Sequence, residues 1–233
     1  MSHKGIEKRH VLFLDAATPL FYIAINDLQK GIVANRQYDH ATIKGEALLS
    51  VVKEMFDETG LTIHSVAYLC TTKGPGSLTG LRISMSILKT MAQILNIPIV
   101  CLPTLYALEC SFKSKEVTIE QRIMTCLTAR KNSYYVRFSG TEEGCFEQIS
   151  SQMFHEAVKN DSICVWAKGL SPAGLCDKET VDSVIIGLNP KIIFELCESR
   201  YLKKDFFNYI ECVPEYAGKS VAERNFENKK SRM

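Results

Sequence analysis

The sequence has little of what marks a metal-binding, secreted or membrane protein. Its nine cysteines include no Cys-x-x-Cys pair, which leaves zinc-ribbon and thioredoxin-like sites without support. Its five histidines include no His-x-x-x-His pair, the simplest helical metal site to recognise. The chain has no apolar run long enough to span a bilayer, and residues 1–10 show no signal-peptide pattern. These absences predict a cytoplasmic protein with reduced cysteines and no contact with a membrane.

An excess of charge of one sign is also missing. Lysine and arginine number 28 against 26 aspartates and glutamates, so the formal net charge is +2 at neutral pH. Such a chain lacks the strong positive field of a general nucleic-acid or membrane binder. Its 233 residues, 46% of them hydrophobic, are enough for one large domain or two small ones with a substantial core.

The most informative segment present is a glycine-rich stretch, residues 74–82, which reads Gly-Pro-Gly-Ser-Leu-Thr-Gly-Leu-Arg. It joins a strand-like run to a long helical pattern, and such turns bind phosphate in many folds because free N–H groups and the helix dipole favour anions. It is neither a P-loop nor a dinucleotide fingerprint, so a purely structural turn and a ligand loop both stay open. The residues of a nucleotide or phosphate loop would be Asp15, Gly74, Gly76, Ser77, Thr79 and Arg82.

Two of these residues have alternative interpretations. Asp15 ends a predicted strand and is either a functional carboxylate or a residue that caps the turn before Thr18 and Pro19. Arg82 either contacts an anion or orients a partner, or it is a solvated surface residue.

Hydrophobic periodicity predicts the order β-β-β-α-β-α-β for the first half. The predicted elements are strands at residues 11–15, 21–25, 32–34, 66–71 and 99–101 and helices at residues 48–56 and 79–95. The first three strands form an antiparallel meander, and Gly60 ends the first helix. A hairpin-led sheet that turns parallel is the ribonuclease-H-like half-domain, and two such halves make the actin-like ATPase (ASKHA) architecture, an α/β fold.

The second half has weaker patterns, and strands are predicted at residues 122–127, 134–138 and 162–166 and a helix at residues 190–203. The polar stretch at residues 110–121 would link the halves. The predicted domains are an N-terminal half at residues 1–109, a divergent C-terminal half at residues 110–220 and a flexible tail at residues 221–233.

The predicted helix at residues 79–95 has more apolar surface than one sheet can cover. A narrow polar stripe from Arg82 to Gln93 separates two apolar sides, whereas a helix on a sheet needs one apolar face of about 100°. Either this helix is central and covered by its own chain, or its second side binds a partner together with the helix at residues 48–56. The side chains of that predicted partner interface are Leu48, Val52, Met55, Met85, Leu88, Met91, Ala92 and Leu95.

The glycine-rich stretch resembles the signature of the TsaB (YeaZ-like) family, Gly-Pro-Gly-Ser-Phe-Thr-Gly-Leu-Arg. The first strand ending in Asp15, the Leu-Asn-Ile-Pro-Ile at residues 95–99 and the Leu-Tyr-Ala-Leu at residues 105–108 resemble that family too. The resemblance implies an actin-like ATPase fold. It also implies a non-catalytic subunit that binds and activates TsaD, the enzyme that transfers a threonylcarbamoyl group to adenosine in tRNA.

The same resemblance implies which groups this chain lacks. TsaD holds its catalytic metal through a His-x-x-x-His motif, and residues 100–109 of this chain, at the matching place, contain no histidine. No catalytic residue and no metal are therefore expected, and no cofactor is assigned to the chain alone, although ATP or ADP would fit at the partner interface. The implied partners are a TsaD-type subunit in a heterodimer, a TsaE-type ATPase, a second copy when TsaD is absent, and tRNA indirectly.

Departures from the family pattern argue against nucleotide binding by this chain, and other functions stay open beside the accessory role. Ala16 and Ala17 stand where the family has Thr-Ser, which removes two hydroxyls suited to phosphate. One alternative is a weak ATPase of the actin and sugar-kinase class that uses Asp15 and the glycine loop. A second is a peptidase, for which the sequence offers no clear nucleophile–base pair. A third activity is direct tRNA contact through the basic tail at Lys229 and Lys230.

Overall fold

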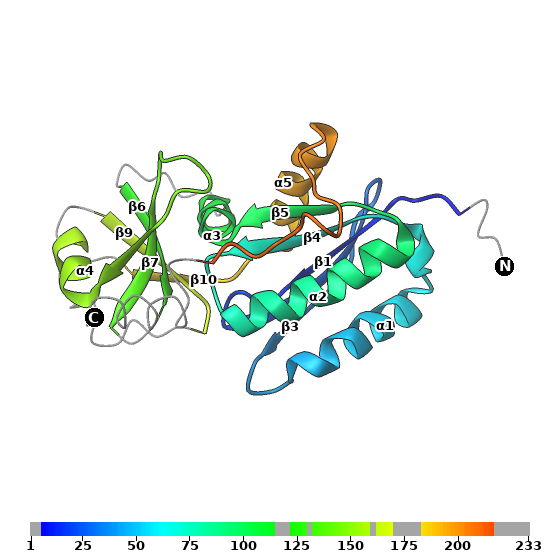
Figure 1. Ribbon diagram of the computed structural model, residues 1–233, viewed down its shortest axis with the longest axis horizontal. Helices are drawn as coiled ribbons and strands as arrows, with labels where there is room; N and C mark the ends of the chain where they lie inside the picture. The colour runs from blue at the N-terminus through cyan, green and yellow to red at the C-terminus, as the bar shows by residue number, and fades with distance from the viewer. Residues whose placement is uncertain (1–5, 115–121, 130–131, 159–161, 170–182, 217–233) are drawn as a thin grey trace, which may run out of the picture.

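Two five-stranded mixed sheets follow one another along the long axis of the computed structural model (Figure 1). The structure describes residues 6–114, 122–129, 132–158, 162–169 and 183–216. No helix in these described ranges is long and apolar enough to cross a bilayer. The predicted tail at residues 221–233 lies outside them.

The first sheet has the strand order β3-β2-β1-β4-β5 and the predicted sequence of elements. β1, β2 and β3 form an antiparallel meander, and β4 and β5 add to β1 in parallel, which confirms the predicted half-domain. Its elements are β1 (His10–Asp15), β2 (Leu20–Asp27), β3 (Gly31–Asp39), η1 (Gly45–Ala47), α1 (Leu48–Thr59), η2 (Ile63–Ser65), β4 (Val66–Gly74), α2 (Leu78–Leu95) and β5 (Ile99–Pro103).

The second sheet repeats this plan with the order β10-β9-β6-β7-β8. β6, β7 and β8 are antiparallel, and β9 and β10 add in parallel. The repeat confirms the actin-like ATPase architecture of two similar halves. Periodicity predicted β6, β7 and β9 but not α4 or the four-residue strands β8 and β10, which are too short for a clear pattern. The elements are β6 (Arg122–Thr128), β7 (Ser133–Phe138), β8 (Glu147–Ser150), α4 (Ser151–Val158), β9 (Ser162–Ala167) and β10 (Ser183–Ile186).

Two further helices join the halves. α3 (Thr104–Lys113) contacts strands of both sheets, so the segment expected to start a link at residue 110 is helical through Lys113. α5 (Pro190–Leu202) comes late in the sequence but packs on β5 and β1 of the first sheet, where the Tyr201 ring stacks on Tyr68 at 4.2 Å. The predicted helix start is confirmed, since Pro190 occupies the first turn and the Asn189 side chain accepts from Lys191 N.

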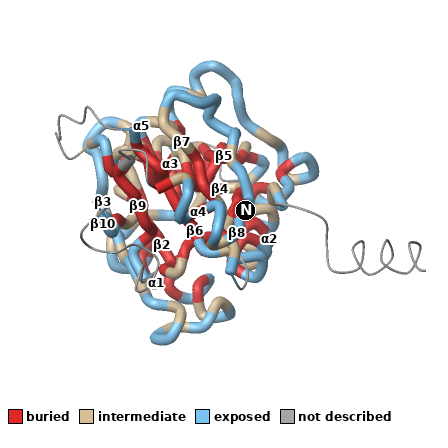
Figure 2. The backbone as a smooth tube through the Cα atoms, turned by 90° about the vertical axis from the view of Figure 1, so that its left-hand side faces the viewer, coloured by how far each residue is buried: buried red, intermediate tan, exposed pale blue. Residues whose placement is uncertain are grey.

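Four strands of the first sheet, β1, β2, β4 and β5, are mostly buried and appear red in Figure 2, whereas the edge strand β3 has no buried residue. Every residue of β1 is buried. α1 and α2 lie side by side on one face, and α3 and α5 cover the other (Figure 1). The core beneath α3 and α5 includes Ile123, Leu127 and Ile163 of the second half, so the two halves share it. β1 and β4 therefore appear in the sequence as continuous apolar runs rather than alternating ones.

Helix ends follow local sequence signals. Gly60 adopts φ +67° after α1, as predicted from the sequence, and Asn96 adopts φ +49° after α2. Ser77 caps the start of α2, where its side chain accepts from Gly80 N at 3.2 Å.

The chain after α5 forms a strap, defined as residues 205–216, that crosses the first sheet beside α2. Phe207 exchanges two backbone hydrogen bonds with Ile99 on β5, at 2.8 and 2.9 Å. Further along, Glu215 N donates to the carbonyl of Lys73 on β4 at 2.6 Å. The strap thereby supplies backbone partners along the edge of a sheet that β5 would otherwise leave open.

Candidate functional site

The glycine loop packs directly against the turn that follows β1. Ser77 N donates to the carbonyl oxygen of Ala17 at 2.8 Å. A Cβ on Gly80 would lie 1.7 Å from the carbonyl oxygen of Ala16, and one on Gly76 would lie 2.5 Å from that of Ala17. Only glycine allows the backbone to approach so closely. Both glycines therefore have a packing role that requires no ligand, as the structural-turn interpretation predicts.

Gly74 is required for a different reason. Its φ of +122° lies in a region that side chains disfavour, and an added Cβ would come within 2.4 Å of the carbonyl oxygen of Glu215 on the strap. Its amide donates to Thr104 Oγ1 at 3.1 Å. Gly74 thus lies where β4, α3 and the strap meet.

Asp15 is fully buried at the end of β1 and accepts all of its hydrogen bonds from its own chain. Thr72 Oγ1 donates to one carboxylate oxygen, and Ala17 N donates to the other at 3.1 Å. Thr104 Oγ1 donates in turn to Thr72 Oγ1 at 3.0 Å, so a chain of hydroxyls leads from Gly74 N to the carboxyl group. This geometry matches the turn-capping interpretation of Asp15. Burial raises the pKa of Asp15 to about 6, although the hydrogen bonds from Thr72 and Ala17 oppose the shift.

We expect Asp15 to make the protein less stable as the pH rises from about 4 to about 7. Its pKa of about 6 in the folded chain exceeds the ordinary value of 3.8, so the folded state holds the proton more tightly. The protonated carboxyl of Asp15 therefore contributes about 3 kcal/mol to the free energy of unfolding at pH values below its ordinary pKa. This contribution is lost as the pH rises through the pKa that Asp15 has in the folded chain. Urea unfolding of wild type and Asp15→Asn across this pH range measures the difference.

Asp57→Asn serves as the control for that experiment. Asp57 is exposed on α1 and pairs with Lys53 at the surface. Its replacement should leave the pH dependence close to that of wild type. Equal pH dependence in wild type and Asp15→Asn would contradict the expectation.

The remaining residues of the predicted ligand loop lie on the surface. Thr79 and Arg82 are exposed on the first turns of α2. Arg82 Nε donates to the hydroxyl of Tyr216 at 3.3 Å, and its guanidinium lies 5.7 Å from the centre of that ring. Arg82 therefore holds the end of the strap against α2. Nucleotide binding by the loop stays a prediction.

The side chains named for the partner interface prove to be core residues. Leu48, Val52 and Met55 of α1 are at most 1% exposed. All of them belong to the cluster between the two helices and the sheet, and Leu95 packs against it half-buried. The α2 residues Met85, Leu88, Met91 and Ala92 are at most 7% exposed in the same cluster. The sheet, rather than a partner, covers this side of the helices, so the predicted interface residues were wrong. The periodicity showed two apolar sides on α2 but could not show which of them faces the sheet.

The second apolar side of α2 is the one that reaches solvent. Ile83 and Ile87 are half-buried and Ile94 is 73% exposed. At 100° per residue these three side chains fall within about 40° of one another and form one stripe, called here the isoleucine stripe. Ile83 packs against Gly45, just before α1, so the stripe starts beside that helix. Leu49 on the first turn of α1 adds another apolar side chain, 54% exposed.

Ser65, His10 and Asp27 come together at the opposite end of β1 from the glycine loop. His10 Nδ1 lies 2.8 Å from Ser65 Oγ, and His10 Nε2 lies 3.4 Å from Asp27 Oδ2. Ser65 Oγ donates to the carbonyl of Thr62 at 2.6 Å, so its proton points away from the imidazole. All three side chains are buried. A hydrolytic serine must give its proton to histidine, and this group instead ties β1, β2 and η2 together.

The segment that matches the metal motif of TsaD forms the end of β5 and the start of α3. Thr104, Leu105, Ala107 and Leu108 are buried there, and the three apolar ones belong to the core that the two halves share. Across the residues that the structure describes, no three His, Cys, Asp or Glu side chains gather closely enough to hold a metal ion.

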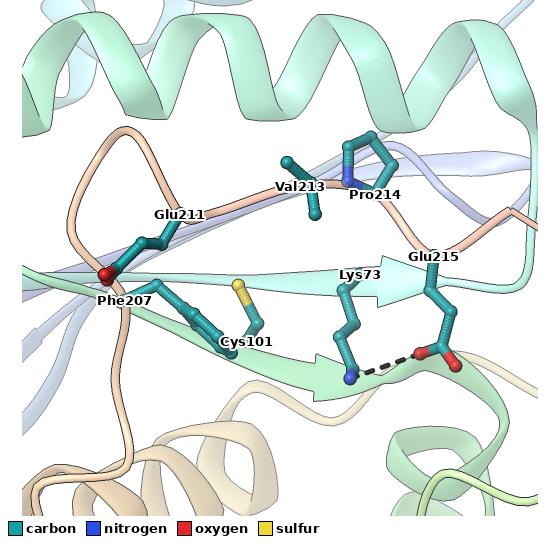
Figure 3. A pocket seen from close by; sticks show the side chains of 7 residues that line it. All are labelled: Lys73, Cys101, Phe207, Glu211, Val213, Pro214 and Glu215. Atoms are coloured by element: carbon teal, nitrogen blue, oxygen red, sulfur yellow. Dashed lines mark ion pairs between the residues drawn. The ribbon is translucent and has the colours of Figure 1, made fainter.

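A cavity of about 310 Å³ opens between β4, β5 and the strap (Figure 3). Lys73 Nζ lies 3.2 Å from Glu215 Oε2 across its end. No local motif in the sequence marks this cavity, because its walls come from β4, β5 and the strap, which follows β5 by more than 100 residues. Its lining residues are Lys73, Cys101, Phe207, Glu211, Val213, Pro214 and Glu215.

Comparison with known proteins gives consistent results. A family model described as tRNA N6-adenosine threonylcarbamoyltransferase (TsaD) matches residues 39–165, more than half of the chain. The chain is 23% identical over 190 residues to the tRNA threonylcarbamoyladenosine biosynthesis protein TsaB of Haemophilus influenzae, covering 75% of this chain and 79% of that protein. It is 28% identical over 89 residues to the protein of the same name from Buchnera aphidicola, covering 38% of this chain and 39% of that protein.

Solved structures with the same fold include YeaZ from Pseudomonas aeruginosa, with a TM-score of 0.70 at 17% identity. That alignment covers 90% of this chain and all of YeaZ. A second structure, of an uncharacterized protein with similarity to peptidase YEAZ from the same organism, has a TM-score of 0.71 at 17% identity and covers 89% of this chain and 99% of that one. At this identity the likeness shows the fold.

Proposed function

Because this chain belongs to the TsaD family, in its TsaB (YeaZ-like) branch, we propose that it is the non-catalytic subunit that binds and activates a TsaD-type enzyme. The reaction is the threonylcarbamoyl modification of adenosine in tRNA, carried out in the cytoplasm. This chain would take part in that biosynthesis through protein–protein contact and would reach tRNA only through its partner.

The segment at the start of α3 supports an accessory role. Residues 100–109, where the resemblance places the metal motif of TsaD, contain no histidine, and Leu105 and Leu108 of this segment are buried in the core that the halves share. Imidazole is the side chain expected for such an ion, and apolar side chains cannot replace it. The activating subunit therefore leaves bond-making to its partner.

The single observation that carries the partner proposal is the isoleucine stripe on α2. Ile94 is 73% exposed on this helix. Covering such an apolar side chain with a partner removes it from water and so stabilises the complex. The half-buried Ile83 and Ile87 continue the stripe, and Leu49 lies on the neighbouring helix. We propose this surface of α1 and α2, rather than the buried side chains beneath it, as the face that meets the TsaD-type subunit.

The test is the affinity of two surface variants for the TsaD-type subunit from the same cell. Ile94→Asp and Leu49→Asp place a charge in the contact, so each should weaken binding at least about tenfold, measured by calorimetry. Both side chains are exposed, so the variants should keep wild-type circular dichroism and unfolding temperature.

Leu202→Asp is the matched control. Leu202 is 74% exposed at the end of α5, on the other face of the sheet. The Leu202→Asp variant should therefore bind the TsaD-type subunit with wild-type affinity. Reconstitution separates binding from activation: the chain alone should modify no adenosine, and adding it to the TsaD-type enzyme should raise the rate. Unchanged affinity in both α1 and α2 variants would refute the proposed face. Modification of tRNA by this chain alone would refute the accessory role.

A further inference from the structure

The strap is fastened to the first sheet at several points along its length. The first is the pair of backbone hydrogen bonds between Phe207 and Ile99, and the last is the bond from Glu215 N to the carbonyl of Lys73. The Lys73–Glu215 ion pair reinforces that end. Between them, the backbone of the strap runs between α2 and the ends of β4 and β5 (Figure 3).

A pair of cysteines lies in the middle of this contact. Cys101 on β5 and Cys212 on the strap are 111 positions apart in the sequence, yet their Sγ atoms are 3.5 Å apart. Both side chains are at most 2% exposed and belong to or border the same apolar cluster beneath α2. A disulfide needs about 2.05 Å between the sulfur atoms, so the two must approach by about 1.5 Å for the bond to form.

The surroundings favour reaction at this pair. The hydrogen bond between the two thiols lowers the pKa of Cys212, and Lys89 on α2 acts in the same direction, while burial opposes both. The same hydrogen bond and burial raise the pKa of Cys101. Cys101 also lines the cavity described above, with its sulfur directed toward the strap (Figure 3). Cys101 is therefore the member of the pair that borders the cavity, and Cys212 lies behind it.

We propose that Cys101 and Cys212 form a reversible disulfide that locks the strap onto β5. In the reaction both S–H bonds break and one S–S bond forms. The two thiols lose two protons and two electrons to one hydrogen peroxide molecule, whose O–O bond breaks to give two waters. A dithiol reductant reverses the reaction. The oxidised strap is held covalently to β5. The reduced strap is held by its backbone hydrogen bonds to Ile99 and Lys73, by the Lys73–Glu215 ion pair and by the contact between Arg82 and Tyr216.

The test is mass spectrometry of the whole chain after mild peroxide treatment. Digestion without reductant should yield a linked peptide that contains Cys101 and Cys212, about 2 Da lighter than the two free peptides. Closing a loop of this length should raise the unfolding midpoint by roughly 5–10 °C, and reductant should reverse the rise. Cleavage by a protease within residues 205–216 should slow in parallel.

Three variants complete the experiment. Cys101→Ser and Cys212→Ser should each lose the linked peptide and the rise in midpoint. Cys145→Ser, at an exposed cysteine of the second half, should keep both. Absence of the linked peptide from wild type, under conditions that oxidise Cys145, would overturn the proposal whatever the variants do. A linked peptide without slower cleavage of the strap would overturn the locking role.

Discussion

Replacing Arg137 by methionine is expected to lower the free energy of unfolding by about 3 kcal/mol, because it leaves one oxygen of the buried Glu109 carboxylate without a charged partner, while the half-exposed Lys113 still pairs with the other oxygen at 2.6 Å. Arg137 on β7 and Glu109 on α3 form an ion pair in which each side chain is only 3% exposed. The guanidinium also donates to the carbonyls of Thr141 at 2.8 Å and Phe138 at 3.2 Å. One side chain thus joins the helix between the halves to the second sheet and to the loop after β7.

The double variant Arg137→Met with Glu109→Leu separates charge from packing. Removing both charges replaces an expensive buried pair by apolar contact, so the double variant should recover much of the loss. Arg200→Met is the matched control, since Arg200 pairs with Glu143 and Asp205 near the surface and should cost no more than about 1 kcal/mol. Urea unfolding measures all four proteins. A double variant no more stable than Arg137→Met would show that the unpaired charge is not the cause.

Gly80→Ala is expected to destabilise the protein by about 3 kcal/mol or more, although alanine favours helices. Helix propensity alone predicts a gain of about 1 kcal/mol for this change inside a helix. The added Cβ, however, would lie 1.7 Å from the carbonyl oxygen of Ala16, and a backbone atom cannot move aside as a flexible side chain can. Overpacking of this kind outweighs propensity, so the sign of the effect distinguishes the two terms.

Gly144→Ala is the control for that variant. No heavy atom lies within 4 Å of a Cβ added there, and its backbone φ is not positive, so the change should stay within about 0.5 kcal/mol of wild type. Thermal and urea unfolding provide the comparison. If Gly80→Ala were as stable as Gly144→Ala, the glycine loop would not pack as closely against the turn after β1 as described here.

The sequence by itself determined the elements of the first half, their order and the glycine that ends α1. The apolar runs of β1 and β4, the repeats in α1 and α2, and Gly60 are signals that depend on neighbours a few positions away, and the structure bears them out. The glycine-rich stretch also marked the right family. These features could be predicted because secondary structure and turns depend on local torsions and on burial with a fixed period.

Only the tertiary structure decided which apolar side of α2 faces the sheet and which distant side chains meet. Met85 and Ile94 look equally suited to a partner in the helical repeat, yet the sheet buries the first and leaves the second exposed. Neither the Arg137–Glu109 pair nor the Cys101–Cys212 pair has a local signal, since their members are 28 and 111 positions apart. Contacts between residues so far apart in the sequence form only when folding brings their chain segments together. They are stabilised by burial of the segments against each other, which local torsions do not determine.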